Sequence, residues 1–148
     1  MGNRAIIKPE DKDIGVYLHW NGGVDSVTAF LKYCELRNFR PFGGSRADGY
    51  GIARFCQVVA NYFGGDGLSI GIETGVEETE DWAAGLDNGI YVVKGWEIVR
   101  RVGTSYPSEG YDLLEMLIAI DDAQPESQRI GRAEIANRLE NPVLKPLF

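Results

Sequence analysis

The stretch VYLHWNGGVDS, residues 16–26, decides the fold because it joins two kinds of secondary structure within a few residues. Its first half alternates side chains as a β-strand does, so Leu18 and Trp20 share one face, which we expect to lie in the core. The tripeptide Asn-Gly-Gly at 21–23 predicts a tight turn, and Asp25 can cap a helix that begins there. We therefore predict a strand, a glycine corner and a helix packed closely against the strand.

On either side of this corner, periodic apolar patterns separated by Gly, Pro and polar turns define the other elements. In chain order we predict strands at 3–8 and 14–20, helices after Asp25 and at 51–63, strands at 68–72, 90–94 and 96–102, and helices at 111–123 and 131–140. This ββ–αα–βββ–αα order predicts one α+β domain, residues 1–148, with a mainly antiparallel sheet and helices packed against it. About residues 1–102 would form its core, and residues 103–148 a helical C-terminal extension.

The charge balance of the chain limits the partners that it can have. Fifteen basic and 22 acidic residues give a net charge of −7, which argues against general nucleic-acid binding, since that depends on neutralising phosphates. The same charge permits docking onto a basic protein surface. No apolar run reaches the roughly 18 residues of a membrane span, and the first residues lack a secretory pattern. We therefore expect a cytoplasmic location and no membrane partner.

His19 is the only histidine and the first candidate for chemistry. As a general base it would need an orienting partner and a substrate within hydrogen-bond reach, whereas at the end of a strand it can serve as a structural hydrogen-bonding group. The chain contains no GxSxG, HExxH, GxGxxG or Cys/His-cluster motif. We therefore assign no catalytic residue, metal or cofactor, and favour binding over enzymatic activity while leaving the second open.

A polar stripe and a nearby basic–aromatic pair are the candidates for ligand binding. Arg54, Gln57 and Asn61 follow one another at helical spacing, and they could face a pocket or form a solvated helix surface. Arg46 and Tyr50 precede them, and a guanidinium beside an aromatic ring suits pairing with phosphate and stacking on a base. With two polar residues of the corner added, the predicted ligand-binding residues are His19, Asn21, Arg46, Tyr50, Arg54, Gln57 and Asn61.

An acidic run covers residues 73–81. It lacks the alternating ligands and the closing Glu of an EF-hand, so we do not expect it to bind a metal. One interpretation is a solvated loop, and the other is a negative surface presented to a basic partner. On the second interpretation the partner-binding residues are Glu77, Glu78, Glu80 and Asp81.

Several motifs occur in order along residues 2–126, among them GNRAII, YLHWNGG, YG.AR.CQV, DNG.Y.VKGWEI and LLEMLIAIDDAQPE. In these motifs the chain resembles a group of small proteins of phages, prophages and other bacterial mobile elements. The resemblance implies an accessory protein that counteracts immunity in the cytoplasm of a bacterial host cell without catalysis. It also implies ligand contacts at His19, Asn21, Arg54, Gln57, Asn61, Asp87 and Asn88, and core positions for Trp20, Phe55 and Trp96.

These observations support three hypotheses about function. The first is a non-enzymatic inhibitor that binds and blocks a host defence protein through its acidic surface. The alternative is a sponge that sequesters a nucleotide-derived signalling molecule, in a concave site that a homo-oligomer could complete. The third is a small enzyme that uses His19. The small size, the negative charge and the resemblance slightly favour protein binding.

Overall fold

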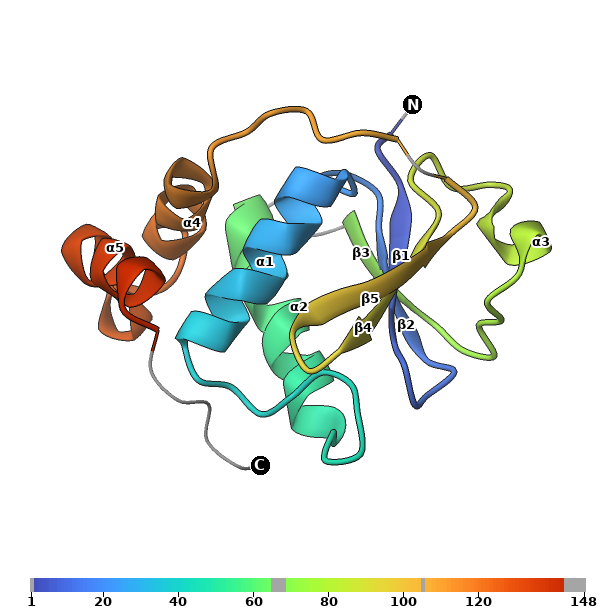
Figure 1. The fold of residues 1–148 in the computed structure, drawn as a ribbon, viewed down its shortest axis with the longest axis horizontal. Coiled ribbons are helices and arrows are strands. Elements are labelled where there is room, and N and C mark those ends of the chain that lie inside the picture. Colours follow the sequence, from blue (N-terminus) through green and yellow to red (C-terminus); the bar gives the residue numbers. More distant parts are fainter. Residues whose placement is uncertain (1, 65–68, 105, 143–148) are drawn as a thin grey trace.

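The structure is a computed structural model that describes residues 2–64, 69–104 and 106–142. It is one α+β domain built on a five-stranded sheet of order β3-β2-β1-β4-β5 (Figure 1). The strands are β1 (Ala5–Pro9), β2 (Gly15–Leu18), β3 (Ile70–Glu73), β4 (Ile90–Lys94) and β5 (Glu97–Val102). The helices are α1 (Val24–Leu36), α2 (Gly49–Phe63), α3 (Glu80–Ala83), α4 (Leu113–Asp122) and α5 (Arg132–Glu140), with a 3₁₀ turn at Glu126–Gln128.

The predicted fold class is confirmed. Strands β1–β2, β2–β3 and β4–β5 pair antiparallel, and β1 pairs with β4 in parallel. The predicted order gains one element, the single-turn helix α3, which Thr79 caps by accepting a hydrogen bond from the Trp82 N–H at 3.3 Å. Position 68 of the predicted strand 68–72 lies outside the described residues.

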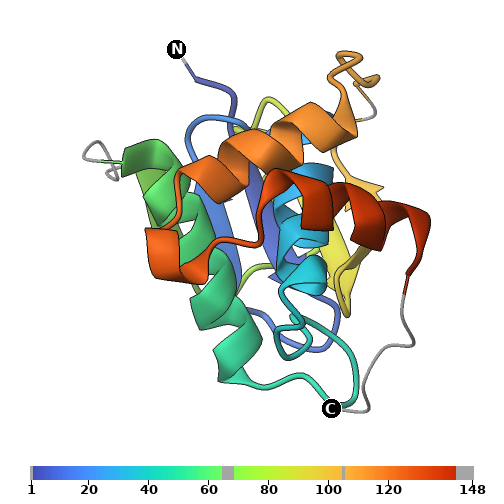
Figure 2. The same ribbon diagram turned by 90° about the vertical axis from the view of Figure 1, so that its left-hand side faces the viewer.

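The sheet carries apolar side chains on both faces. Ile7 and Tyr91 belong to the larger core cluster, which lies between the sheet and the helices α1 and α2. Ile6 and Val92 belong to a second cluster on the other face, where Ala83 of α3 packs against the sheet. Figure 1 shows α3 on the opposite side of the sheet from α1 and α2, and Figure 2 shows α4 lying across these two helices with α5 beside it.

The predicted glycine corner is confirmed, and Gly22 shows why glycine is needed there. A Cβ at Gly22 would overlap the Asn3 carbonyl oxygen, which accepts a hydrogen bond from the Gly22 N–H at 2.8 Å. The Gly22 carbonyl in turn accepts a bond from the Tyr91 hydroxyl at 2.7 Å. Asn21 adopts a positive φ of 57°, which Asn tolerates better than most residues. The chain therefore passes tightly over the start of β1 as it enters α1.

The expected core position of Trp20 is wrong. Leu18 is fully buried, as predicted, but β2 ends there, so the alternation of side chains does not continue to Trp20. Trp20 is 47% exposed, and its ring meets the His19 ring edge-on with centroids 5.1 Å apart. The expected core positions of Phe55 and Trp96 are confirmed, since both residues are buried.

The predicted cap of the first helix is also wrong. Gly23 occupies the N-cap position of α1, and Asp25 lies within the first turn. The Asp25 carboxylate accepts hydrogen bonds from the Ser108 hydroxyl at 2.6 Å and from the Tyr111 N–H at 3.2 Å. These bonds lower the pKa of Asp25. The carboxylate thus joins the start of α1 to the segment before α4. Local spacing could not predict this contact, because that segment lies far along the sequence.

A buried carboxylate joins the C-terminal helices to α1. Asp121, at the end of α4, is 2% exposed. Its Oδ1 accepts a hydrogen bond from the Tyr33 hydroxyl at 2.6 Å and another from the Ile130 N–H at 2.8 Å. Its Oδ2 accepts one from the Gly131 N–H at 2.9 Å. One side chain therefore holds α1, α4 and the start of α5 together.

We expect Asp121→Ala to lower the free energy of unfolding by about 3 kcal/mol, because an orphaned buried donor costs roughly 1–3 kcal/mol and three donors lose their acceptor. Urea denaturation measures the change. The matched control is Asp122→Ala, an exposed neighbour, for which we expect a change within about 0.5 kcal/mol. Equal effects of the two substitutions would contradict the role of Asp121 in holding the three helices together.

Candidate functional site

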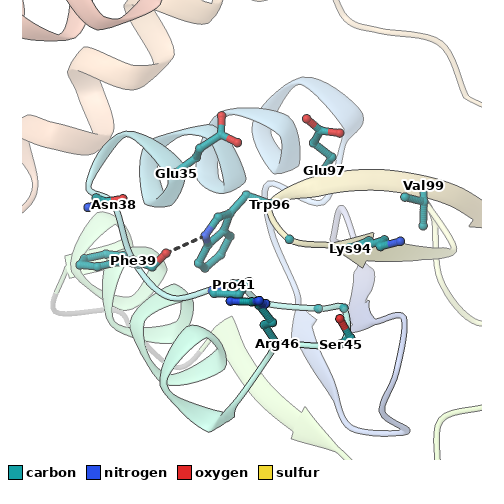
Figure 3. Close-up of a pocket in the computed structure, with 13 residues that line it drawn as sticks. Glu35, Asn38, Phe39, Pro41, Ser45, Arg46, Lys94, Trp96, Glu97 and Val99 are labelled. Atoms are coloured by element: carbon teal, nitrogen blue, oxygen red, sulfur yellow. Dashed lines mark hydrogen bonds between the residues drawn. The ribbon is translucent and has the colours of Figure 1, made fainter. Parts of the chain in front are cut away.

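A pocket lies where the loop between α1 and α2 meets the turn between β4 and β5 (Figure 3). Its walls come from the last turns of α1, from the loop at 38–46 and from the turn at 94–97. Its volume is about 410 Å³, which falls within the roughly 300–1,000 Å³ of small-molecule sites. We call it the loop–turn pocket.

Glycines allow the loop and the turn to approach closely enough to form this pocket. Gly43 and Gly95 form an isolated antiparallel bridge, and the Phe42 N–H donates to the Gly95 carbonyl at 3.0 Å. A Cβ at Gly43 would overlap the Val93 carbonyl oxygen. Gly95 has a φ of 66°, which favours glycine at the turn. The loop and the turn that line the pocket are therefore joined by direct backbone contacts.

Trp96 forms a fixed wall of the pocket. The residue is buried, with 8% of its surface exposed. Its Nε1–H donates to the Phe39 carbonyl at 3.2 Å, the bond drawn in Figure 3. The Phe42 ring packs against the indole with centroids 5.8 Å apart. The indole is thus oriented before any ligand arrives, which lowers the entropy lost on binding.

Charged side chains of both signs surround the indole. Arg46 of the loop and Lys94 of the turn are exposed at the pocket. Glu35 and Glu97 also line it, and the Glu35 carboxylate pairs with the Lys32 ammonium at 2.7 Å. In the view of Figure 3 the two carboxylates lie on one side of the Trp96 ring and the Arg46 guanidinium on the other. The pocket can therefore bind an anionic group and, across the ring, a group with hydrogen-bond donors.

The predicted ligand-binding residues of α2 do not share one site. Tyr50, Arg54 and Gln57 lie on an exposed surface of α2, where the Arg40 guanidinium stacks on the Tyr50 ring at 4.5 Å from its centroid. Asn61 turns instead towards the C-terminal segment, and its Nδ2 donates to Gln124 at 2.9 Å. Among the predicted set, Arg46 is the residue that lines the loop–turn pocket.

The two predicted residues of the corner lie at the other end of the sheet. Leu18 pairs with Ala5, whereas Pro9, at the far end of β1, pairs with Val93 beside the β4–β5 turn. His19 follows Leu18, and its Nδ1 is 2.9 Å from the Tyr17 hydroxyl oxygen. The contacts with the Tyr17 hydroxyl and the Trp20 ring support the interpretation of His19 as a structural hydrogen-bonding group.

Asn21 also makes a local contact, since its Nδ2 donates to the Ser26 hydroxyl at 3.3 Å.

Asp87 and Asn88 of the DNG motif form hydrogen bonds with the N-terminal segment. The Asp87 carboxylate accepts bonds from the Arg4 backbone N–H at 3.0 Å and from the Arg4 Nε at 3.1 Å. Asn88 is 4% exposed, and its Nδ2 donates to the Asn3 side chain. These contacts give Asn21, Asp87 and Asn88 structural roles.

The predicted acidic surface is divided between paired and exposed carboxylates. Glu78 accepts hydrogen bonds from the Arg100 Nε at 2.6 Å and from the Lys8 Nζ at 3.0 Å. The Arg100 bond, with the Lys8 contact, lowers the pKa of Glu78. Glu77 and two acidic residues of α3 are exposed. Glu78 therefore fastens the α3 segment to the sheet.

Sequence reasoning missed Lys94, Trp96 and the two glutamates of the pocket. Lys94 was predicted at the end of a strand and Trp96 in the core, and both positions are confirmed. A possible signal is the glycine pair at 43–44 followed by Arg46, because adjacent glycines often allow backbone to approach another segment. The identity of that segment is a tertiary contact that spacing does not reveal.

No protein-family model, curated protein or solved structure matches the chain. Across residues 2–64, 69–104 and 106–142, no helix combines the length and apolar character needed to cross a bilayer. The same residues contain no cluster of three or more His, Cys, Asp or Glu side chains that could hold a metal ion. The function must therefore be inferred from the pocket and from the charged surfaces.

We expect Glu78→Gln to lower the free energy of unfolding at pH 7 by about 1 kcal/mol, because hydrogen bonds to a charged group are weakened. The pKa of Glu78 is lower in the folded state, so its contribution is complete above the unfolded value near 4.5 and is lost as the pH falls through the folded value. Denaturant unfolding at several pH values should show the difference from wild type shrinking below about pH 4.5. Glu77→Gln, the exposed neighbour, is the control, and a pH-independent difference for Glu78→Gln would contradict the assignment.

Proposed function

We propose that the protein is a non-enzymatic accessory protein of a phage or mobile element that sequesters a nucleotide-derived signalling molecule in the loop–turn pocket. The observation that carries the proposal is that Arg46, Lys94 and the fixed indole of Trp96 line one cavity of about 410 Å³. Guanidinium and ammonium groups bind phosphate oxygens, and bases stack on aromatic rings. A nucleotide carries both of the groups that these side chains recognise.

The distribution of charge supports an anionic ligand. The chain has a net charge of −7, yet within the described residues neither Arg46 nor Lys94 forms an ion pair. Arg40, in the same loop, is paired with Asp48 at 2.9 Å. Arg46 and Lys94 are therefore available to a ligand, and cations that line a cleft raise the local concentration of anions.

The carboxylates of the pocket fit the sugar of the same ligand. Glu35 and Glu97 line the pocket together with Trp96. Carboxylates accept hydrogen bonds from ribose hydroxyls in dinucleotide-binding folds. A pocket that combines cations, an aromatic wall and carboxylates suits a nucleotide better than it suits inorganic phosphate alone.

A second candidate function is binding to a basic surface of a host defence protein. The exposure of Glu77, Glu80 and Asp81 supports it. Glu80 and Asp81 nevertheless lie in the first turn of α3, where acidic side chains complement the helix dipole, and Glu78 is held by two cations. The acidic segment thus has a structural explanation. Pull-down from a host lysate with Glu77, Glu80 and Asp81 neutralised tests this candidate, and unchanged capture would remove the acidic segment from it.

The sponge proposal predicts retention of a nucleotide by the intact protein. Native mass spectrometry and calorimetry with cyclic nucleotides, ADP-ribose derivatives and AMP should show one-to-one binding per pocket. We expect Arg46→Ala and Lys94→Ala each to weaken that binding by about 10- to 100-fold, because each removes a charge-assisted hydrogen bond of roughly 1.5–3 kcal/mol. Binding should also weaken as the salt concentration rises.

The control is Arg54→Ala, which removes an exposed cation from α2 outside the pocket. We expect it to leave the dissociation constant within about twofold of wild type. Loss of binding in Arg54→Ala but not in Arg46→Ala would move the site to the exposed surface of α2. Failure of the wild-type protein to retain any nucleotide of the panel would refute the proposal.

A further inference from the structure

A smaller cavity adjoins the loop–turn pocket and shares Glu35, Trp96 and Glu97 with it. Its volume is about 240 Å³, below the roughly 300 Å³ at which complete small-molecule sites begin. It is therefore a compartment of a larger site rather than a site by itself. We call it the side cavity, and its remaining lining residues are Thr28, Leu31, Lys32, Ile98 and Leu113.

The side cavity differs in chemistry from the pocket beside it. Leu31, Ile98 and Leu113 give it an apolar lining, and Trp96 forms the shared wall. Apolar and aromatic surfaces contact the faces of a flat ring, while a small number of polar groups bind its edge. Thr28 supplies a hydroxyl at the exposed surface of α1 for such an edge contact.

Arg46 and Lys94, the cations proposed to bind phosphate, line the loop–turn pocket and not the side cavity. Among the described residues that line the side cavity, Lys32 is the cation, and its ammonium is paired with Glu35 at 2.7 Å. Glu97 adds a second carboxylate to the lining. The same two carboxylates line the loop–turn pocket, so they do not distinguish the two compartments. The difference is that Arg46 and Lys94 line the larger pocket, where they attract phosphate. The two compartments therefore select different parts of one ligand.

We propose that the side cavity binds the nucleobase of a nucleotide whose phosphate lies at Arg46 and Lys94, an assignment that rests on the proposed function. Trp96 separates the two compartments, and its ring is held by the hydrogen bond to Phe39. The ligand must then carry a base as well as a phosphate. A sugar phosphate without a base fills only the loop–turn pocket and binds more weakly.

Methyl-detected NMR titration of the intact protein locates the base directly. AMP, CMP and ribose 5-phosphate are the probes. We expect the nucleotides to shift the methyl signals of Leu31, Ile98 and Leu113, and ribose 5-phosphate to leave those signals in place. Calorimetry should show AMP binding about tenfold or more tightly than ribose 5-phosphate, the gain typical of one base stacked in a protein site.

Thr28→Phe fills the side cavity from the surface of α1, where the threonine is exposed. We expect it to weaken AMP binding about tenfold, to the level of ribose 5-phosphate, and to leave the affinity for ribose 5-phosphate unchanged. Ala119→Phe adds the same ring at an exposed position of α4 outside both cavities, and it should change neither affinity. Circular dichroism and thermal unfolding of both variants check that each is folded.

The outcomes separate this inference from the proposed function. If AMP and ribose 5-phosphate bind equally, or if Thr28→Phe weakens both to the same extent, the side cavity does not bind the base although the phosphate site stands. Methyl shifts of Ile98 and Leu113 with ribose 5-phosphate alone would place the sugar phosphate there and overturn the assignment. If no probe binds the wild-type protein, the phosphate site and the base compartment fail together.

Discussion

The close approach of Gly22 to the Asn3 carbonyl is the constraint on which the rest of the structure depends. It turns the chain from β2 into α1 with no room for a side chain, and the Tyr91 hydroxyl fixes the same turn to β4. Helix α1 therefore packs on the face of the sheet that carries Ile7 and Tyr91. From that position it presents Tyr33 to the buried Asp121 and supplies one wall to each of the two cavities. A corner at one end of the sheet thus determines where a pocket forms at the other.

The two ends of the sheet have different chemistry. At the corner end, polar side chains are used in structural contacts, as in the bonds of Asp87 to Arg4 and of Asn88 to Asn3. At the end that carries the β4–β5 turn, Arg46 and Lys94 remain at the edge of a cavity. This separation allows a protein of net charge −7 to keep a region attractive to anions, because electrostatic potential follows local charges more than the total.

The periodicity of the sequence predicted the features that depend on neighbouring residues. It failed for the features that depend on contacts with distant segments of the chain. The α+β class, the glycine corner and the burial of Leu18 follow from local patterns. Trp20 was placed in the core because alternation was extended past the end of β2. Asp25 was expected to cap a helix because it follows the glycine turn, and its bond to Ser108 was missed because Ser108 lies far along the chain. Arg46 was identified from its chemistry. The rest of the pocket was missed because residues 43 and 95 meet only in the folded protein.

The parallel pairing of β1 with β4 also affects how the chain acquires its structure during synthesis. Ile6 pairs with Ile90, so the centre of the sheet cannot close until more than half of the chain has left the ribosome. Until then the hairpin of β1 and β2 must expose the apolar edge that β4 later covers. Closing such a long loop carries an entropic cost before its contacts form, which slows folding. Nascent chains that end before β4 should therefore be prone to aggregation.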